Sequence, residues 1–428
     1  MSSAIDTPTA ERLRSIAERH GTPAFVYFAE PMRQRAARLS EAMRGRLAVS
    51  YAMKCNPNLA LVRSLRSAVS LLDASSAGEI ARGIAAGYPA GAIAFSGPAK
   101  RRREVEYAVA VGCGRVVCES TRQIALVDEV ARAHGRRQPV LLRINPARVP
   151  KRFGLQMGGR ASQFGIDEEA IDDAVVSSTT LQGVDCAGLH VYSAGNSLDE
   201  DAIAENVELI ADLFGRVIDR NQLQPRELVF GSGFGIPYFA GDRELDLERL
   251  AGRIVPAIDA LLDRPGCESA RCVLEMGRWL VGPDGYLLTS VVDAKTSRGT
   301  AIRICDAGFN NHLSACGMMG TVMRRDWQFV NLSRADAAPT GKYLLAGPLC
   351  ASFDVLGTSV ELPATEPGDV LAVCSSGAYG LTASPTRFIS HPEPIEILVD
   401  DALKEGDVDV TESMLNAPAE VSTARGRA

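Results

Sequence analysis

The chain has 428 residues, of which 46% are hydrophobic and 23% charged, and its formal net charge is −6. A chain of this length exceeds what one hydrophobic core usually organises, so we expect two domains. The acidic balance provides no general basic surface for nucleic acid, and no apolar run approaches the roughly 20 residues that span a bilayer. The N-terminal residues form no hydrophobic signal core, so we predict a cytoplasmic protein without nucleic-acid or membrane partners.

Ten cysteines are spread along the chain, and the closest pairs, Cys113/Cys118 and Cys267/Cys272, are five residues apart. They are too dilute for a disulfide scaffold, and no Cys-x-x-Cys or His-rich spacing favours zinc. We therefore predict reduced thiols and no metal site.

The first predicted elements are a helix over residues 8–20, with Thr7 as a candidate N-cap, and a strand over 25–28. From about residue 30 to 280, short apolar strands alternate with amphipathic helices. The predicted strands are 47–53, 69–73, 92–96, 115–118, 139–144, 183–191, 227–231 and 270–275. About eight β/α units in roughly 250 residues predict a TIM (β/α)8 barrel. An open doubly wound sheet is the competing α/β arrangement, which periodicity alone does not exclude.

After residue 280 the predicted elements become strands joined by Gly, Pro and Asn turns, with few good helices. We therefore predict a barrel domain over 30–280 and a mainly β C-terminal domain over 281–398, which the strand around 24–29 joins. Residues 399–428 are first acidic and then small and polar, and we predict a flexible tail there.

Lys54 ends an apolar strand and is followed by a Cys-Asn-Pro-Asn turn. The carboxyl ends of barrel strands are where barrel enzymes place catalytic groups. A lysine partly desolvated there has a lowered pKa, so its amine can form a Schiff base with an aldehyde cofactor. Because such a lysine is more often solvent-facing, this interpretation depends on the remaining motifs.

Gly231-Ser-Gly-Phe-Gly-Ile-Pro237 follows the predicted strand 228–230. Its backbone N–H groups can turn toward a compact phosphate, and it matches neither the dinucleotide fingerprint nor a P-loop. Glu275 ends another strand, where its carboxylate can keep a pyridine nitrogen protonated and so favour loss of carbon dioxide. The alternative for Glu275 is a surface ion pair with Arg278.

Three further side chains are candidates whose commoner roles are structural. The His190 ring can stack on a planar cofactor, although a satisfied core histidine is the more frequent case. The Cys350 thiol can donate a proton to a carbanion, although a buried thiol usually only packs. The Tyr379 hydroxyl, between glycines, can bind a phosphate or simply pack.

Six motifs occur in the order seen in one family: Tyr-Ala-Met-Lys54, His190-Val-Tyr-Ser, Gly231-Ser-Gly-Phe-Gly, Glu275-Met-Gly-Arg, Gly347-Pro-Leu-Cys and Gly377-Ala-Tyr. The chain resembles the fold type III pyridoxal phosphate decarboxylases, the diaminopimelate and ornithine decarboxylase group, over roughly residues 25 to 395. The resemblance implies a barrel plus a β domain, pyridoxal 5'-phosphate as cofactor, and a head-to-tail homodimer with shared active sites. Alanine racemases share the fold but have an arginine at the position of Glu275, which favours decarboxylation here.

The resemblance also implies residue roles. Lys54 would be the Schiff-base lysine, Glu275 the partner of the pyridine nitrogen, and His190 the residue stacked on the ring. Cys350 of the partner subunit would be the proton donor. The other residues implied in holding the cofactor and its phosphate are Asp73, Ser193, Gly231, Ser232, Gly233, Phe234, Gly235, Arg278 and Tyr379.

Departures from the family pattern concern the substrate. Diaminopimelate decarboxylases have a glutamate directly after the cysteine and ornithine decarboxylases an aspartate, to bind the distal amine, whereas this chain has Ala351. An unpaired ammonium in a desolvated pocket costs about 1–3 kcal/mol, so a free diamine fits poorly. Gln163 stands where relatives often have a lysine that pairs across the dimer with the aspartate matching Asp354.

Residues 310–325, which include His312 and Arg324, look more like the subgroup that decarboxylates glutamate held as a thioester on an acyl carrier protein. We expect an α-decarboxylase of an L-amino acid or amino-acyl derivative, acting on a small-molecule or carrier-linked substrate. The residues expected near this substrate are Ala351, His312, Asp354 and Arg324. The alternatives are a meso-diaminopimelate decarboxylase that makes lysine and, from another class, a non-catalytic regulatory homologue.

Overall fold

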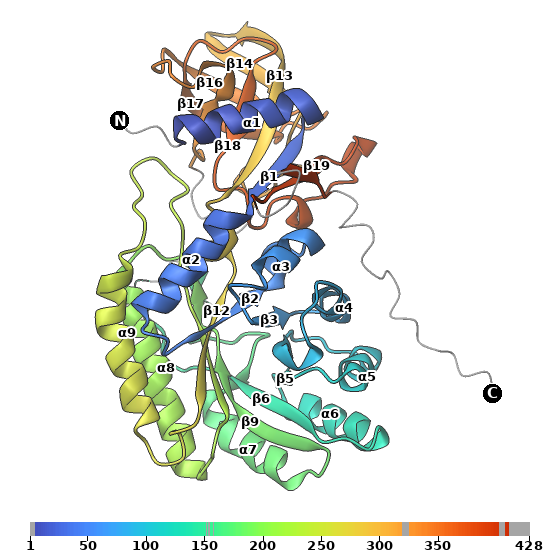
Figure 1. Cartoon of the computed structure of the whole chain (residues 1–428), viewed down its shortest axis with the longest axis vertical. Helices are drawn as coiled ribbons and strands as arrows, with labels where there is room; N and C mark the ends of the chain where they lie inside the picture. The colour runs from blue at the N-terminus through green and yellow to red at the C-terminus, as the bar shows by residue number, and fades with distance from the viewer. Residues whose placement is uncertain are drawn as a thin grey trace, which may run out of the picture. The chain divides into compact units, whose positions relative to one another are not determined.

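The computed structural model describes residues 5–150, 152, 155–156, 158–318, 325–401 and 407–410. The chain forms two compact units, which Figure 1 shows from one side. The first, called the barrel unit, comprises Arg33–Gly235 and Leu245–Leu280. The second, called the β unit, comprises the residues up to Met32, Ile236–Glu244 and the described residues from Val281 onward.

Eight parallel strands close on themselves in the barrel unit. The neighbours run β2-β3-β4-β5-β6-β9-β11-β12, and β12 pairs with β2 to complete the circle. The strands are β2 (Ala48–Ala52), β3 (Leu71–Ala74), β4 (Ile93–Phe95), β5 (Arg115–Cys118), β6 (Gln138–Asn145), β9 (Val184–Val191), β11 (Glu227–Gly231) and β12 (Arg271–Met276). The predicted TIM barrel is confirmed, because an open sheet would leave two unpaired edges.

Helices alternate with these strands and form the outer ring of the barrel unit (Figure 1). They are α2 (Ala29–Ala42), α3 (Leu59–Leu65), α4 (Ala77–Ala85), α5 (Arg102–Val111), α6 (Thr121–Ala133), α7 (Ile171–Thr180), α8 (Glu200–Asn221) and α9 (Leu247–Leu262). One buried apolar side chain from each of seven strands fills the interior: Leu71, Ala94, Val117, Leu141, Ala187, Val229 and Val273. The barrel is therefore a packed core rather than a pore, and its chemistry must lie at a rim.

The β unit is built on a nine-stranded sheet with the path β17-β16-β14-β13-β1-β19-β20, to which β18 and β15 are added beside β13. The N-terminal strand β1 pairs antiparallel with β13 and parallel with β19. The strands are β1 (Ala24–Phe28), β13 (Gly285–Ser297), β14 (Thr300–Cys305), β15 (Phe329–Asn331), β16 (Gly341–Ala346), β17 (Val355–Leu362), β18 (Val370–Val373), β19 (Ile395–Val399) and β20 (Asp407–Asp409).

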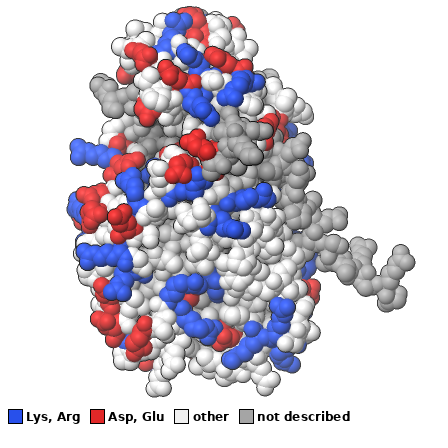
Figure 2. Space-filling view, in the orientation of Figure 1, with Lys and Arg blue, Asp and Glu red and all other residues white. Residues whose placement is uncertain are grey.

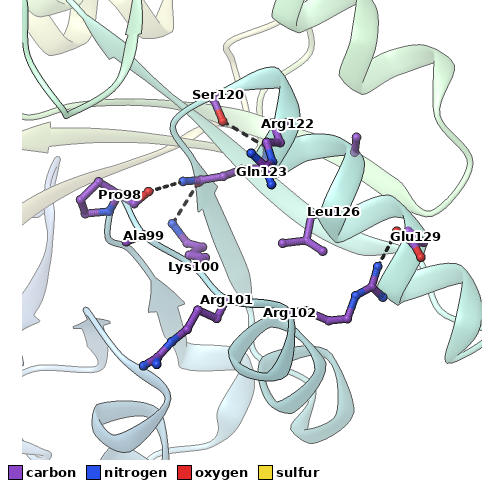
Figure 3. A pocket seen from close by; sticks show the side chains of 11 residues that line it. Pro98, Ala99, Lys100, Arg101, Arg102, Ser120, Arg122, Gln123, Leu126 and Glu129 are labelled. Carbon is purple, nitrogen blue, oxygen red and sulfur yellow. Dashed lines mark hydrogen bonds and ion pairs between the residues drawn. The ribbon is translucent and has the colours of Figure 1, made fainter.

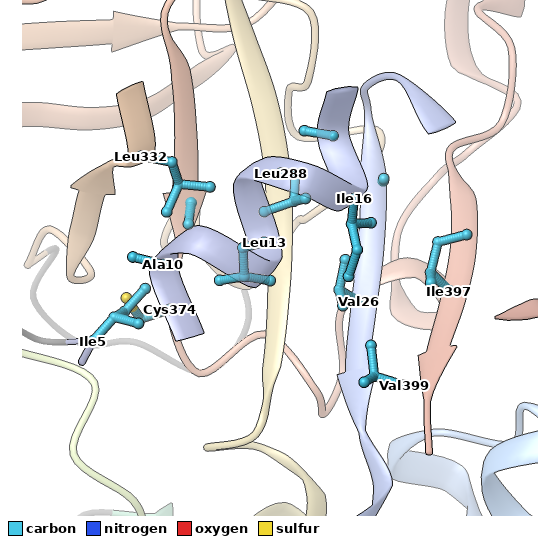
Figure 4. Close-up of a cluster of buried hydrophobic side chains, with 13 residues drawn as sticks. Ile5, Ala10, Leu13, Ile16, Val26, Leu288, Leu332, Cys374, Ile397 and Val399 are labelled. Atoms are coloured by element: carbon cyan, nitrogen blue, oxygen red, sulfur yellow. The ribbon is translucent and has the colours of Figure 1, made fainter. Parts of the chain in front are cut away.

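Helix α1 (Thr7–His20) covers part of this sheet, and its Leu13 and Ile16 are fully buried against strand residues such as Val26 and Leu288 (Figure 4). The N-cap is Asp6 rather than the expected Thr7, because the Thr9 amide donates to Asp6 Oδ1 at 2.8 Å.

Two stretches differ from the expected segmentation. Residues Ile236–Glu244, inside the predicted barrel range, belong to the β unit. Within the predicted tail, β20 pairs with β19, so Asp409 lies opposite Ile397. Among the described residues no helix is both long and apolar enough to cross a membrane.

Candidate active site

The predicted barrel residues gather at the carboxyl ends of the parallel strands. Lys54 lies in a short 3-10 turn directly after β2, Asp73 lies in β3 and His190 in β9. Glu275, near the end of β12, is in register with Gly231 at the end of β11. All five positions therefore occupy one rim of the barrel, which is the rim that barrel enzymes use.

His190 and Glu275 form a buried pair that the sequence did not predict. The His190 Nε2 atom lies 2.9 Å from Glu275 Oε1, and the two residues are only 2% and 6% exposed. Burial alone would raise the pKa of Glu275, but the charge and hydrogen bond of His190, with Lys54 and Arg143, outweigh it and lower the pKa. Glu275 is thus a buried, ionised carboxylate, and the alternative of a surface ion pair with Arg278 does not apply.

Asp73 is the second buried carboxylate of the rim. The Ser96 hydroxyl donates to Asp73 Oδ1 at 2.5 Å. Burial first, and then the negative charge of Glu275, raise the pKa of Asp73. Lys54 is exposed, and its Nζ lies 5.3 Å from the centre of the Tyr192 ring. The described residues therefore do not desolvate this lysine in the way the sequence suggested.

The glycine-rich loop after β11 forms a close-packed cradle. A Cβ at Gly231 would lie 2.6 Å from the Tyr192 ring, and one at Gly235 would lie 2.8 Å from the Ser197 carbonyl oxygen. The Ser197 amide donates to the Gly233 carbonyl at 2.9 Å. The Gly235 amide donates to the Ser197 carbonyl at 2.8 Å. Only glycine fits at both positions, so the loop is held in one shape against the Tyr192–Ser197 segment. Ser232 and Phe234 are buried in this loop.

Ser193 is joined to the same loop by a residue that sequence reasoning missed. The Ser193 hydroxyl donates to Asn206 Oδ1 at 2.5 Å, and Asn206 Nδ2 donates to the Gly231 carbonyl at 3.4 Å. Asn206 is 1% exposed and lies on the buried side of α8, beside Ile203 and Val207. A polar side chain on the apolar side of an amphipathic helix was the signal that could have revealed it.

Glu79 is a second missed residue. Its carboxylate accepts from the Ser75 amide at 2.6 Å, and its own amide donates to the N-cap residue Ser76. Burial raises the pKa of Glu79 to about 7, and nearby Asp73 adds to this effect while Lys54 opposes it. The capping pattern Ser-x-x-Glu was visible in the sequence, but it indicated only a helix start.

Apart from Arg278, the remaining predicted residues that the structure describes belong to the β unit. All ten cysteines are among the described residues, and Cys350 is the exposed one. Asp354 is buried, and its two carboxylate oxygens accept from the Phe309 and Leu349 amides, each at 2.8 Å. Asp354 therefore braces the loop that bears Cys350 and Ala351 from within the chain.

Tyr379 and Arg278 are both partly exposed. Tyr379 lies in the turn after β18 with a positive φ of 53°, and the Ser314 hydroxyl donates to its carbonyl oxygen at 2.9 Å. Arg278 follows β12 directly, at the start of a four-residue helix.

His312 is fully buried in the β unit, between Phe25 and Trp327, whose ring centres lie 5.8 and 4.8 Å away. Burial lowers the pKa of His312 to about 3, and its Nε2 has no hydrogen-bond partner among the described residues. This position argues against the predicted substrate contact, because the ring is enclosed by aromatic side chains. The other predicted residue of this segment, Arg324, lies outside the described residues.

Comparisons with known proteins agree with this geometry. Residues 30–282 match the family model "Pyridoxal-dependent decarboxylase, pyridoxal binding domain". The chain is 31% identical to L-glutamyl-[BtrI acyl-carrier protein] decarboxylase of Niallia circulans, with 90% of each chain covered. It is 32% identical to diaminopimelate decarboxylase of Methanothermobacter thermautotrophicus, with 92% of this chain and 90% of the relative covered.

Among solved structures, diaminopimelate decarboxylase from M. jannaschi is similar, with a TM-score of 0.83 and 26% identity over 93% of this chain and 91% of that one. Fold, rim residues and comparisons together define a barrel enzyme that uses an aldehyde cofactor. The chain belongs to the pyridoxal-dependent decarboxylases of fold type III. It is a carboxy-lyase, and its cofactor is pyridoxal phosphate.

The barrel rim fits this cofactor. The glycines at 231 and 235 let the loop pack closely on Tyr192 and Ser197, which holds its backbone in a fixed position at the rim. The lowered pKa of Glu275 keeps a negative charge for a protonated ring nitrogen. The buried His190 Nδ1 has no partner among the described residues.

Proposed function

We propose that this decarboxylase removes the α-carboxyl group of an L-amino-acid derivative whose distal end is neutral or joined to a carrier protein. The observation on which the proposal rests is Ala351, a methyl group directly after the exposed Cys350. A distal ammonium would find no carboxylate there, at a cost of about 1–3 kcal/mol once desolvated. A thioester or amide carries no such charge.

Glutamate bound as a thioester meets this requirement. Decarboxylation needs a free α-amine and a free α-carboxylate, so the thioester must use the side-chain carboxyl group of glutamate. The distal end is then uncharged and continues into the carrier arm. The printed name of the Niallia circulans relative, an acyl-carrier-protein-linked glutamyl decarboxylase, supports this substrate class.

The roles of the rim residues follow from their positions. Lys54 would hold the cofactor through its Nζ until a substrate amine displaces it. Glu275 would keep the ring nitrogen protonated, and the His190 Nε2–H would hold the Glu275 carboxylate in place. Bound pyridoxal phosphate supplies the sink for the electron pair left when carbon dioxide departs. The groups proposed to bind its phosphate are the amides of the loop 231–235 other than that of Gly235, which donates to the Ser197 carbonyl, together with Ser193, Arg278 and Tyr379.

We further propose a homodimer in which Cys350 of the partner subunit donates the proton that replaces the lost carboxyl group. Exposed apolar side chains near the Cys350 loop support this assembly. Phe353 is 52% exposed, and it and the exposed Phe388 both pack on buried Phe309, at 4.9 and 5.4 Å between ring centres. An uncovered aromatic cluster of this kind is typical of a surface that a second subunit covers.

The second candidate is meso-diaminopimelate decarboxylase, which the Methanothermobacter relative supports at nearly the same identity. The two candidates are separated by measuring carbon dioxide release from a γ-glutamyl thioester, glutamate, meso-diaminopimelate and ornithine with the holoenzyme. Our proposal requires turnover of the thioester. Release of lysine from the diacid without thioester turnover would replace it with the second candidate.

A further inference from the structure

A second feature of the barrel unit lies beside the rim and is not used by the proposed chemistry. The loops after β4 and β5, with the first turns of α5 and α6, enclose a cavity of about 750 Å³ (Figure 3). Both loops follow the carboxyl ends of barrel strands, so the cavity opens on the same end of the barrel as Lys54. Ser96, which holds Asp73, begins the first of these loops.

The walls of the cavity are basic although the chain as a whole is acidic. Four basic side chains and one acidic side chain line it, whereas the net charge of the whole chain is −6. The basic residues Lys100 to Arg103 are consecutive, and Arg122 lies in the first turn of α6. The lining residues that carry charge are Lys100, Arg101, Arg102, Arg122 and Glu129.

Two of these cations lack a carboxylate partner. Lys100 Nζ donates to the Gly97 and Val117 carbonyl oxygens, each at 2.6 Å, and to Gln123 Oε1 at 3.3 Å. Arg122 is exposed and makes no ion pair in the part of the chain that the structure describes. Arg101 and Arg102 do pair, with Glu104 at 3.0 Å and Glu129 at 2.6 Å. An excess of positive charge therefore remains at the cavity.

The cavity is also braced in one shape. Gln123 Nε2 donates to the Pro98 carbonyl at 2.8 Å, and Gln123 Oε1 accepts from the Glu119 amide at 3.0 Å. The bond to Pro98 ties the loop after β4 to the start of α6, and the bond from Glu119 fixes Gln123 to the loop that precedes α6 (Figure 3). A preformed site loses little entropy on binding a ligand.

Between α8 and α9, arginine side chains are paired with carboxylates. Arg253 pairs with Glu208 at 2.7 Å, Arg249 with Asp201 at 2.8 Å and Arg264 with Asp219 at 2.5 Å. Figure 2 shows acidic and basic side chains mixed along this left edge of the molecule. Arg122, by contrast, has no such carboxylate partner in the described part of the chain.

We propose that the α5–α6 cavity is the docking surface for an acidic protein that presents the substrate, with the exposed Arg122 providing the charge that attracts it. This inference rests on the proposed function, in which the substrate is linked to a carrier protein. An acidic surface docked here would lie on the rim that bears Lys54, so that a flexible arm could extend from it to the site.

The test compares three γ-glutamyl thioesters with the holoenzyme: one on an acidic acyl carrier protein, one on coenzyme A and one on N-acetylcysteamine. The charge reversal is Arg122→Glu, which the first turn of α6 should tolerate because an acid is favourable at a helix N-terminus. The matched control is Arg38→Glu, an exposed arginine of α2 with no ion pair among the described residues. The measured quantity is kcat/KM for carbon dioxide release.

We expect Arg122→Glu to lower kcat/KM for the carrier-linked thioester by about tenfold, less at high salt, and to leave the N-acetylcysteamine thioester unchanged. Arg38→Glu should change neither. An unchanged carrier-linked rate in Arg122→Glu would overturn the docking surface while leaving the proposed function intact. If Arg122→Glu lowered kcat/KM equally for the coenzyme A thioester, the cavity would recognise a phosphate rather than an acidic protein. Failure of the wild-type protein on all three thioesters would overturn both proposals.

Discussion

The two units of the chain hold their functional side chains in different ways. In the barrel unit these side chains bind one another: His190 binds Glu275, Ser96 binds Asp73, and Asn206 binds Ser193. In the β unit the loop of Cys350 is held by backbone amides that converge on Asp354. The rim residues are held by contacts between side chains, so the groups proposed to carry the chemistry depend on one another. The Cys350 loop is held through backbone amides, so a side chain such as that of Ala351 can differ without loss of the loop's shape.

The largest effect should follow loss of Lys54. Lys54→Ala removes the amine that holds the cofactor, so we expect activity to fall on the order of 10⁴-fold. The visible absorbance of the bound cofactor should shift at the same time. Lys54→Arg is the matched control, because it keeps the charge but not the reactive amine, and it should lose activity equally. Substantial activity in either variant would refute the assignment.

Glu275→Gln should come next, with kcat reduced about 10²- to 10³-fold. Glutamine keeps the shape but removes the charge that would hold a proton on the ring nitrogen. The pH dependence of the cofactor absorbance separates this role from a loss of folding, because the ring nitrogen should lose its proton at lower pH in the variant. An unaltered titration would mean that Glu275 has another role.

A smaller effect, about tenfold in kcat, is expected for Asp354→Asn, since asparagine has one side-chain oxygen and cannot accept from both the Leu349 amide of the Cys350 loop and the Phe309 amide. The control is Asp326→Asn, because Asp326 accepts from the Thr358 and Ser359 amides at 2.8 and 2.7 Å in the same unit. If both variants lose kcat alike, Asp354 merely stabilises the β unit and does not position Cys350.

The smallest effect concerns stability rather than catalysis. An unfolded histidine binds a proton below about pH 6.5, whereas burial holds the pKa of His312 to about 3. The unfolded state therefore binds more protons between these values, and the free energy of unfolding should fall by about 1.4 kcal/mol per pH unit as the pH drops below 6.5. In urea titrations, the free energy of unfolding of His312→Phe should not show this decrease at low pH. His134→Asn, which replaces an exposed histidine, should still show it.

Much of the barrel could be predicted from sequence because its strands are short, mostly apolar runs, and most of them end in or lead directly into a polar or glycine residue, as at Ser75 and Gly231. The β20 strand was missed, since residues 407–409 alternate acids with a single valine. Side-chain partners were harder to predict. Asn206 meets Ser193 only after α8 folds against the barrel, and Asp354 meets an amide 45 residues away.

The central claim is that Ala351 makes this enzyme select a neutral distal end. It is tested by the ratio of kcat/KM for a γ-glutamyl thioester to that for meso-diaminopimelate, measured in wild type and in Ala351→Glu. We predict a ratio of at least about ten in the wild type, and a shift toward the diacid in the variant, whose new carboxylate can pair with the distal ammonium. A wild-type ratio below one that Ala351→Glu leaves unchanged would contradict the claim.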